Sequence, residues 1–478
     1  MLKFIYRLDG DIMSKFENIP IRITSLSLAA LMALGLSGCK TNKEKSQSIS
    51  ESSSIVIEAD DYFVSNKKDT NEISNYDELL ATLKTNTSQF DTDTQQELEK
   101  LFNIIYTNYD NVSNLLEFNG FPSKDDLIME KFIEPLKNIK FIKTIKQGDE
   151  NFLDNLDRIG GASCYKKEEN GIYLVYWGSE SEAERQRVLF EEIIHSTQKE
   201  LTESDTMDGC DYYIFGEGEA NAISGLLVED KINNTNSFLF YDENNKNHEY
   251  CNHGIGGYHY TLASKYYMYL VTLVGYDAVN SFKENTDSKI ISDKLTNLYG
   301  IDGIEYYDNM KKVIADAFSD ITDKRTDMFV ENEQIYYKCL DKRLSYINTE
   351  KDAEDFFDLY RYMVNQYGSE YYEYDENDNY IDMSSMKFDR SDIEEKLFNK
   401  MVSFKIFDNL SESKNNQKAI FYALLHPKMK YDESYYPSSL KNCNVSYDGE
   451  NVIIEYGEDC FVTNLNSRET AIKEGKTK

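Results

Sequence analysis

The sequence predicts an α+β fold that is predominantly α-helical and carries a small antiparallel sheet. Three observations predict this class: apolar residues recur at helical spacing over long stretches, only 5 Pro interrupt the 478 residues, and strand-like runs are short. Hydrophobic residues make up 40% of the chain, which suffices for a core although the formal net charge is −33. That charge would repel phosphate backbones, so we exclude nucleic acid as a partner.

The first 38 residues have the order of a targeting segment. Lys15 and Arg22 stand before or at the start of an apolar run over residues 23–36, which is too short to span a bilayer comfortably. The run ends in Leu36-Ser37-Gly38-Cys39, which resembles the lipobox of bacterial lipoproteins. The resemblance implies that residues 1–38 form a signal peptide and that Cys39 carries the lipid. The alternative is a buried hydrophobic helix with a chance Cys.

The residues after Cys39 predict a flexible tether over 39–58. Residues 40–54 are polar and Ser-rich, and they cannot bury enough apolar surface to order themselves. No later apolar run is long enough to cross a bilayer. We therefore expect a protein anchored through Cys39 to the outer, extracytoplasmic face of a bacterial cell membrane, of Gram-positive type. Translation that starts at Met1 and translation that starts at Met13 are both consistent with this location.

Cysteine usage agrees with export. Apart from Cys39 the chain has an even number of cysteines, which permits up to three disulfides outside the cytoplasm. These are Cys164, Cys210, Cys251, Cys339, Cys443 and Cys460. Cys443 with Cys460 is the simplest pair because a predicted hairpin lies between them. A body of this size can build its own core, so the disulfides are optional.

Four regions follow the tether. Residues 59–150 predict a helical N-terminal region, because periodicity runs from residue 75 to 146 and is strongest over 76–83, 94–106 and 127–141. Pro135 marks a kink or a helix start there. Residues 151–285 mix strands and helices. The strands are expected at 164–166 and 172–177, and the helices at about 181–198 (capped by Ser179 or Ser181), 217–230 and 260–282.

The remaining two regions are expected to be helical and then β-rich. Residues 286–430 predict helices over 304–318, 352–367, 392–407 and 418–425. Residues 431–478 predict a hairpin of strands at 445–447 and 452–456 around the turn Asp448-Gly449, followed by a loose tail after Asn464.

The stretch 187–198 is the most informative for chemistry. On a helix, Glu191, Glu192 and His195 fall on one stripe at spacings of three and four, while apolar residues occupy the other faces. Carboxylates in such surroundings need a partner. A metal ion is one such partner, and a nearby Arg or Lys is another.

The run Glu191-Glu192-Ile193-Ile194-His195 resembles the H-E-x-x-H helix of the zincin metallopeptidases, with Glu191 in place of the first His. Downstream, Glu217-Gly218-Glu219-Ala220 resembles the E-G-x-A of the gluzincin branch. The resemblance covers roughly residues 160–285. It implies a zincin-like central region that holds Zn²⁺ on Glu191, His195 and Glu217, with Glu192 as general base and a peptide or protein as substrate. It also places the run 172–177 as the edge strand and the helix 260–282 as a supporting core helix.

The departure at Glu191 changes the expected chemistry. Two carboxylates and one imidazole cancel the +2 charge of Zn²⁺, which weakens the ion as a Lewis acid. Three alternatives stay open: a metal site that hydrolyses peptides, a metal site without efficient catalysis, and an inactive scaffold. If the fold is zincin-like, His253 or His259 could replace the missing imidazole or stabilise an oxyanion. A second cluster, His248 to His253, is a weaker metal candidate.

The sequence thus favours a membrane-anchored extracytoplasmic lipoprotein with a degenerate metallopeptidase-like core. The main alternative is a non-catalytic surface lipoprotein that binds a partner on an inactive peptidase scaffold. A solute-binding lipoprotein is disfavoured, because the chain lacks the repeated strand-helix pattern of two doubly wound lobes.

Overall fold

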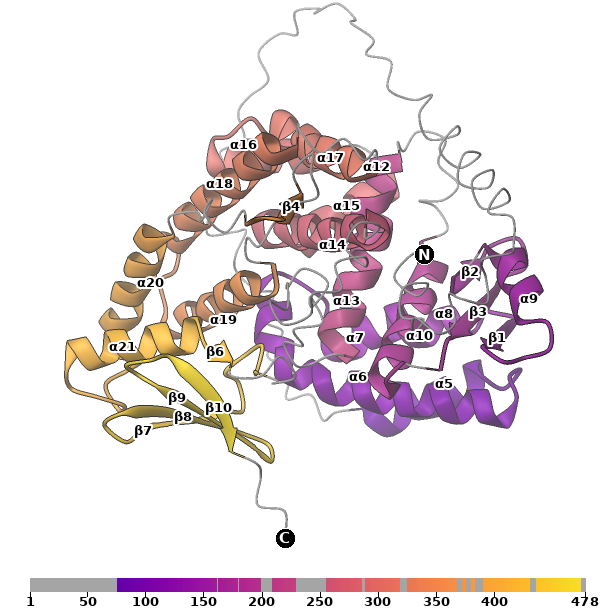
Figure 1. Ribbon diagram of the computed structural model, residues 1–478, viewed down its shortest axis with the longest axis horizontal. Helices are drawn as coiled ribbons and strands as arrows, with labels where there is room; N and C mark the ends of the chain where they lie inside the picture. The colour runs from indigo at the N-terminus through magenta and orange to yellow at the C-terminus, as the bar shows by residue number, and fades with distance from the viewer. Residues whose placement is uncertain are drawn as a thin grey trace, which may run out of the picture.

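The computed structural model describes residues 75–160, 162–178, 180–198, 209–228, 255–285, 289–318, 325–367, 372–374, 380–382, 390–429 and 436–473. Helices dominate these residues and small sheets lie at two edges of the molecule, which confirms a predominantly helical α+β fold (Figure 1). The predicted signal peptide, Cys39 and the tether lie outside the described residues, as do His248, Cys251 and His253.

The N-terminal region begins with the predicted helices, here α5 (Tyr76–Asn86) and α6 (Thr92–Phe118). The Asp91 carboxylate caps α6 by accepting a hydrogen bond from the Thr94 amide at 2.8 Å. The third predicted helix is split into α7 (Lys124–Ile128), a π-helical turn η1 (Met129–Ile133) and α8 (Glu134–Leu136). Pro135 stands in the first turn of α8, which confirms its prediction as a helix start.

The helical periodicity predicted up to residue 146 is wrong at its end. Residues Phe141–Lys146 form strand β1, which pairs in parallel with β3 (Gly171–Tyr176). Ile142, Thr144 and Ile145 are β-branched and favour this conformation. The pairing partner lies about thirty residues away along the chain, so a local periodicity could not reveal it.

A three-stranded sheet in the order β1-β3-β2 leads into the candidate site. Strand β2 (Cys164–Lys166) pairs antiparallel with β3, and helix α9 (Phe152–Ile159) connects β1 to β2. Five of the six residues of β3 are buried, because one face of the strand packs into the main hydrophobic core and the other packs against α9. The prediction that residues 172–177 form the edge strand is therefore wrong: β3 is central, and β1 and β2 are the edges.

The next two segments carry the predicted ligands. Helix α10 (Glu182–Thr197) starts at Ser181, whose hydroxyl accepts from the Glu184 amide at 3.1 Å, as predicted. The helix expected from Glu217 begins earlier, as α12 (Gly209–Tyr212), the π-helical turn η2 (Tyr213–Glu217) and α13 (Gly218–Val228).

The predicted core helix is two helices, α14 (Ile255–Val274) and α15 (Tyr276–Asn285). Gly275 separates them with a φ of +85°, a conformation that glycine adopts at no steric cost. The Tyr276 amide then donates to the carbonyl of Asn119 at 2.9 Å, which ties the break to the end of α6. Among the described residues, no helix is both long and apolar enough to cross a membrane.

The C-terminal half is a stack of helices, four of them predicted within a few residues of their bounds. These four are α17 (Gly303–Phe318), α19 (Glu350–Tyr367), α20 (Ser391–Ser403) and α21 (Lys414–Leu425). Two further helices, α16 (Lys289–Tyr299) and α18 (Arg325–Leu344), were not expected from the sequence. Charged residues are spread along α18, which obscures its apolar stripe.

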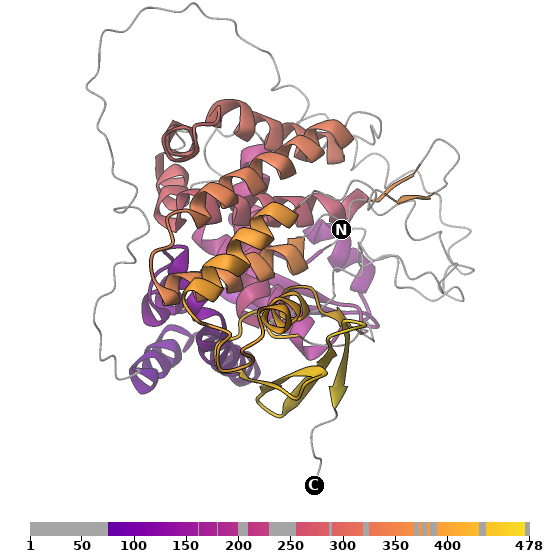
Figure 2. The ribbon, with the colours of Figure 1, turned by 90° about the vertical axis from the view of Figure 1, so that its left-hand side faces the viewer.

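The C-terminal sheet has the order β6-β10-β9-β8-β7 and packs against α21 (Figure 2). Its strands are β6 (Lys428–Met429), β7 (Asn444–Tyr447), β8 (Asn451–Tyr456), β9 (Asp459–Asn464) and β10 (Glu469–Lys473). The predicted hairpin is confirmed as β7 and β8. The prediction of a loose tail is wrong, because β10 pairs with both β9 and β6. A small hairpin of β4 (Tyr372–Tyr374) and β5 (Tyr380–Asp382) lies apart.

The four cysteines whose side chains the structure describes are thiols, while the side chains of Cys210 and Cys251 lie outside the described residues. Cys443 and Cys460 do not form the simplest predicted disulfide: the Cys443 Sγ donates to the carbonyl of Ser439, and Cys460 sits within β9 opposite Glu455 and Lys473. Cys164 and Cys339 are likewise thiols. The helical core supplies enough buried surface for the fold to form without these bridges.

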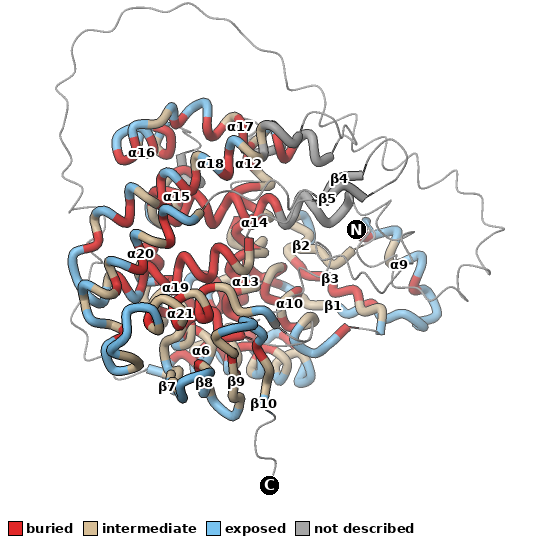
Figure 3. The backbone as a smooth tube through the Cα atoms, turned by 60° about the vertical axis from the view of Figure 1, so that its left-hand side comes forward, coloured by how far each residue is buried: buried red, intermediate tan, exposed pale blue. Residues whose placement is uncertain are grey.

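One continuous hydrophobic core draws residues from all four regions after the tether, and α13, α14 and α19 are mostly buried (Figure 3). Helix α13 packs between α10 and α14. Gly218 permits the contact with α14, because a Cβ at this position would lie 2.5 Å from the Ala263 carbonyl oxygen. This close approach fixes the neighbouring Glu217.

Substituting Gly218→Ala should lower the free energy of unfolding by about 1–3 kcal/mol, because the added methyl group forces α13 away from α14. Chemical denaturation measures the change. Gly225→Ala is the matched control on the same helix: a Cβ there meets nothing within 4 Å, so it should raise stability by about 0.5–1 kcal/mol. Equal effects of the two substitutions would contradict the close packing.

Candidate metal centre

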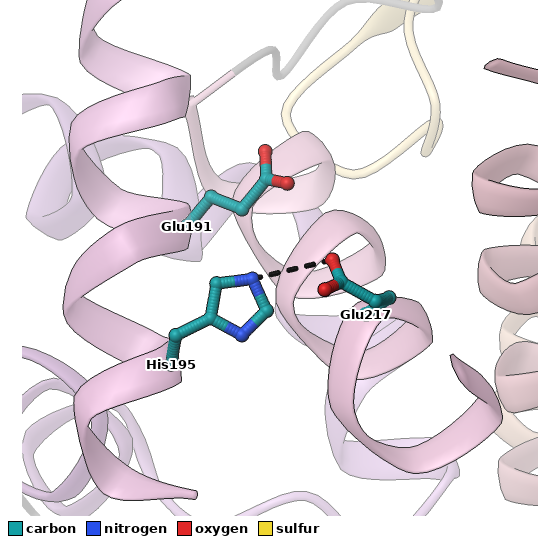
Figure 4. A group of neighbouring side chains, drawn as sticks. All are labelled: Glu191, His195 and Glu217. Atoms are coloured by element: carbon teal, nitrogen blue, oxygen red, sulfur yellow. Dashed lines mark ion pairs between the residues drawn. The ribbon is translucent and has the colours of Figure 1, made fainter. Parts of the chain in front are cut away.

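The three predicted ligands converge. Glu191 and His195 lie one turn apart on α10, and Glu217 faces them from the end of η2 (Figure 4). One ligand atom from each residue lies within 4.8 Å of the others, and the side chains are mostly buried, with exposed fractions of 13–14%. Two carboxylate oxygens and one imidazole nitrogen are donors that suit Zn²⁺.

The three ligand atoms lie somewhat farther apart than a bound Zn²⁺ ion requires. Tetrahedral Zn²⁺ with bonds near 2 Å holds its ligand atoms roughly 3.3 Å apart. The pair of ligand atoms in contact, His195 Nε2 and Glu217 Oε2, is already at 3.3 Å. Rotation of the Glu191 side chain, which is long and has three flexible torsions, would be enough to complete the set.

Each carboxylate of the site has polar partners from the protein. Arg187 Nη1 donates to Glu191 Oε2 at 2.8 Å, and Asn221 Nδ2 donates to Glu191 Oε1 at 2.9 Å. The Tyr212 hydroxyl donates to Glu217 Oε1 at 3.2 Å. Sequence reasoning gave no role to Arg187, Asn221 or Tyr212. The available signal was helical spacing, because Arg187 precedes Glu191 by four residues and Asn221 follows Glu217 by four.

A buried polar chain fixes the orientation of His195. Its Nδ1 lies 2.9 Å from Gln198 Oε1, and Gln198 Nε2 donates to Glu219 Oε2 at 2.7 Å and to the Gly216 carbonyl at 3.1 Å. Glu219 is completely buried and its other oxygen lies 3.2 Å from the buried Lys131 Nζ. Because the amide group uses its nitrogen on Glu219, its oxygen accepts from Nδ1–H, and the imidazole turns Nε2 toward the ligand site.

Lys131 is the cation at the inner end of this chain. Burial opposes its charge, but Glu219, with Tyr276 and Glu130, outweighs burial and raises the pKa of Lys131 well above its ordinary value. Lys131 lies in the π-helical turn η1, and its Nζ is 2.9 Å from Glu130 Oε1. The sequence offered no signal for this residue, since a lysine within an apolar helical stretch usually lies on the solvated side.

The charges of the site hold His195 in its protonated form. Burial by itself would lower the pKa of His195, but Glu217, at 3.3 Å, and the nearby Glu192 and Glu191 raise it to about 10. The metal-free cluster is therefore two ion pairs, Arg187 with Glu191 and His195 with Glu217. Burial and the adjacent Glu217 also raise the pKa of the Tyr212 hydroxyl well above its ordinary value.

Glu192, the predicted general base, follows Glu191 on α10 and contacts strand β2. It is 6% exposed and accepts a hydrogen bond from the backbone N–H of Tyr165 in β2. Burial raises its pKa to about 8, opposed by His195 and reinforced by Glu191 and Glu217. In the metal-free protein Glu192 is consequently mostly protonated at neutral pH.

The expectation that His253 or His259 joins the cluster falls outside the described residues. His259 belongs to α14, but its side chain lies outside the described residues, as do His248 and His253 altogether. His426 is on a different part of the fold, where its Nε2 lies 2.9 Å from Glu394 Oε1.

Comparisons with known proteins give no match: no protein-family model, no curated protein and no solved structure matches the chain. Function must therefore be inferred from the chemistry of the cluster itself.

The His195 imidazole should titrate far above its ordinary value of about 6.5 in protein freed of metal with EDTA. Its pKa, followed by the NMR shift of the ring protons, should fall back toward 6.5 in Glu217→Gln, because the main opposing charge is removed. The stability that this pair contributes is present below about pH 6.5 and is lost as pH rises through about 10. Glu182→Gln, on the exposed first turn of α10, is the control and should leave the titration unchanged. A His195 titration near 6.5 in the unsubstituted protein would rule out the ion pair.

Proposed function

We propose that this protein is a membrane-anchored bacterial lipoprotein with a gluzincin-type metal centre, and that Glu191, His195 and Glu217 hold a divalent metal, Zn²⁺ first. The observation that carries the proposal is the convergence of these three side chains from two helices, with ligand atoms within 4.8 Å of one another. They stand in the order E-E-x-x-H and then E-G-x-A along the chain. These are the positions that the resemblance to the gluzincins assigns to the metal ligands.

The surroundings support a zincin-like central region. Strand β3 leads directly into the helix of the motif, and the next helical segment supplies Glu217. Helix α14 then packs behind α13 as the supporting core helix that the resemblance implies. The buried chain from His195 through Gln198 and Glu219 to Lys131 is the kind of support that metal-ligating imidazoles receive.

The reaction that this arrangement best serves is hydrolysis of a peptide bond. The bound ion would supply Lewis acidity at the scissile carbonyl and at water. Glu192 would move the proton, and a divalent cation beside it would favour its ionised form, which it needs as a base. Among the described strands β2 pairs with β3 alone, so we assign an extended peptide to the other edge of β2, beside the Tyr165 N–H that donates to Glu192.

A second candidate is the non-catalytic binding lipoprotein on an inactive scaffold. The observation that favours it is that the charges of the metal-free cluster are already paired with one another. Arg187 with Glu191 and His195 with Glu217 are two ion pairs that satisfy the buried charges without an ion. A protein of this kind would use its surface to bind a partner and would keep the cluster for stability alone.

Titration of the EDTA-treated protein, purified in detergent, should show one equivalent of tightly bound Zn²⁺ per chain, because three buried donors share one position. Glu217→Gln should weaken binding by roughly a hundredfold or more, since it removes a charged ligand. Competition with a chromophoric chelator measures both. Glu182→Gln, an exposed carboxylate on the same helix as two of the ligands, is the matched control. If the folded protein binds no Zn²⁺, the metal site is ruled out and the non-catalytic binding lipoprotein remains as the candidate function.

The zinc-loaded protein should also cleave an unstructured protein such as casein. Glu192→Gln should abolish cleavage without weakening Zn²⁺ binding, because Glu192 is assigned to proton transfer and not to the metal. Zinc binding without cleavage of any peptide would separate a metal-binding lipoprotein from a peptidase.

Membrane attachment should depend on Cys39 alone. Cys39→Ser should move the protein from the membrane fraction to the soluble fraction and abolish incorporation of radiolabelled palmitate, because the lipid would have no sulfur to occupy. Cys164→Ser is the matched control and should stay in the membrane fraction. Retention of the Cys39→Ser protein in the membrane would place the anchor elsewhere.

A further inference from the structure

Arg187 and Asn221 each donate a hydrogen bond to a different carboxylate oxygen of Glu191. Arg187 Nη1 lies 2.8 Å from Oε2 and Asn221 Nδ2 lies 2.9 Å from Oε1. The same Arg187 nitrogen also donates to Asn221 Oδ1 at 3.4 Å, so each of the three side chains contacts the other two. All three come from the two segments that build the candidate centre: Arg187 and Glu191 from α10, and Asn221 from α13.

The chemistry of these contacts suits a carboxylate and no other ligand at this position. An imidazole here would present an N–H to its neighbours and would need an acceptor, whereas both Arg187 and Asn221 present N–H groups. The surroundings of position 191 are therefore built for the residue that departs from the H-E-x-x-H pattern.

The guanidinium also changes the charge of the donor set. Glu191 and Glu217 together would cancel a divalent ion, but Arg187 is always protonated and returns one positive charge at hydrogen-bond distance from Glu191. Glu191 paired with Arg187 carries no net charge, as a neutral imidazole carries none. A carboxylate has four lone-pair sites, so Glu191 can keep both hydrogen bonds and still offer an oxygen to a metal.

We propose that Arg187 is a charge-setting and positioning residue of the metal centre, which together with Asn221 makes Glu191 the equivalent of a neutral ligand. This inference rests on the proposed metal site. Its consequence is that a divalent ion keeps a charge of about +1 when only the three ligands and Arg187 are counted. This charge favours the ionised form of Glu192 and ligands that bring a negative or strongly polarised oxygen, such as a peptide carbonyl or a carboxylate.

A purely structural role for Arg187 leads to different expectations. An ion pair between residues four apart on one helix stabilises the helix by only a few tenths of a kcal/mol. In a purely structural role, Arg187 would do no more than hold the Glu191 side chain in place. Removal of a support loosens the ligand and weakens metal binding. Removal of a charge-setting residue withdraws a repulsive positive charge and strengthens metal binding, so the two roles predict opposite signs.

The test is the dissociation constant for Zn²⁺, measured by chelator competition on the full chain and on five variants. Arg187→Met should bind Zn²⁺ about tenfold more tightly than the unsubstituted protein, because a unit charge near the ion is removed. Arg187→Lys keeps the charge and should stay within about threefold of the unsubstituted protein. Glu191→His should bind at least about tenfold more weakly, because the negative charge of Glu191 is lost while the positive charge of Arg187 stays near the ion. Glu191→His with Arg187→Met restores the net charge and should bind like the unsubstituted protein.

Arg185→Met is the matched control for the loss of one positive charge from α10. Arg185 Nη1 donates to the carbonyl of Glu180 at 2.8 Å and its guanidinium stacks over Tyr176, away from the ligands. It should change Zn²⁺ affinity by less than about threefold. Circular dichroism melting establishes that each variant is folded, and Arg187→Gln replaces Arg187→Met if the latter does not fold.

The outcomes separate the inference from the proposed function. Zinc binding that is unchanged or weaker in Arg187→Met overturns the inference and leaves the metal site standing. An absence of binding in every protein overturns both. Binding that appears only after Arg187 is removed supports the charge-setting role and overturns the proposed function, because the natural chain would then be closed to metal.

Discussion

The backbone of α13 lies so close to α14 at Gly218 that no side chain fits between them. This contact fixes the first turn of α13 against α14, whose residues 262–274 all lie in the core or are buried. Glu217 and Glu219 stand on either side of Gly218 and serve two purposes. Glu217 pairs with His195 in the cluster, whereas Glu219 pairs with Lys131 and supports His195 through Gln198. One close helix contact therefore positions both the ligand and its support.

The cluster also concentrates acidic side chains in a mostly buried place. Four acidic residues, Glu191, Glu192, Glu217 and Glu219, lie mostly or fully buried within two neighbouring helical segments. Arg187, His195 and Lys131 each pair with one of them. The fourth, Glu192, is mostly protonated at neutral pH because burial raises its pKa to about 8. The metal-free state is thus stable as it stands. A divalent ion would have to displace the proton of His195, which makes affinity the decisive property of this site.

Local signals predicted much of the helical framework. The cap at Ser181, the helix start at Pro135 and the turn Asp448-Gly449 each depend on a few adjacent residues, and the structure has them where the sequence places them. Elements that depend on distant partners were missed or misread. Strand β1 needs β3 for its hydrogen bonds, and β10 needs β9 and β6, so neither carries a sufficient signal of its own. The break at Gly275 depends on Asn119, which lies far away in the chain.

By itself the sequence determined the residue types and spacings of the candidate site. Glu191 and His195 share a helix face because they are four residues apart, and this follows from helix geometry alone. Whether Glu217 meets them, and which groups neutralise them, was decided by tertiary structure. The roles of Arg187, Asn221, Gln198 and Lys131 arise from the packing of η1, α10 and α13 against one another. Electrostatic partners are chosen by distance in space, and distance along the chain does not encode them.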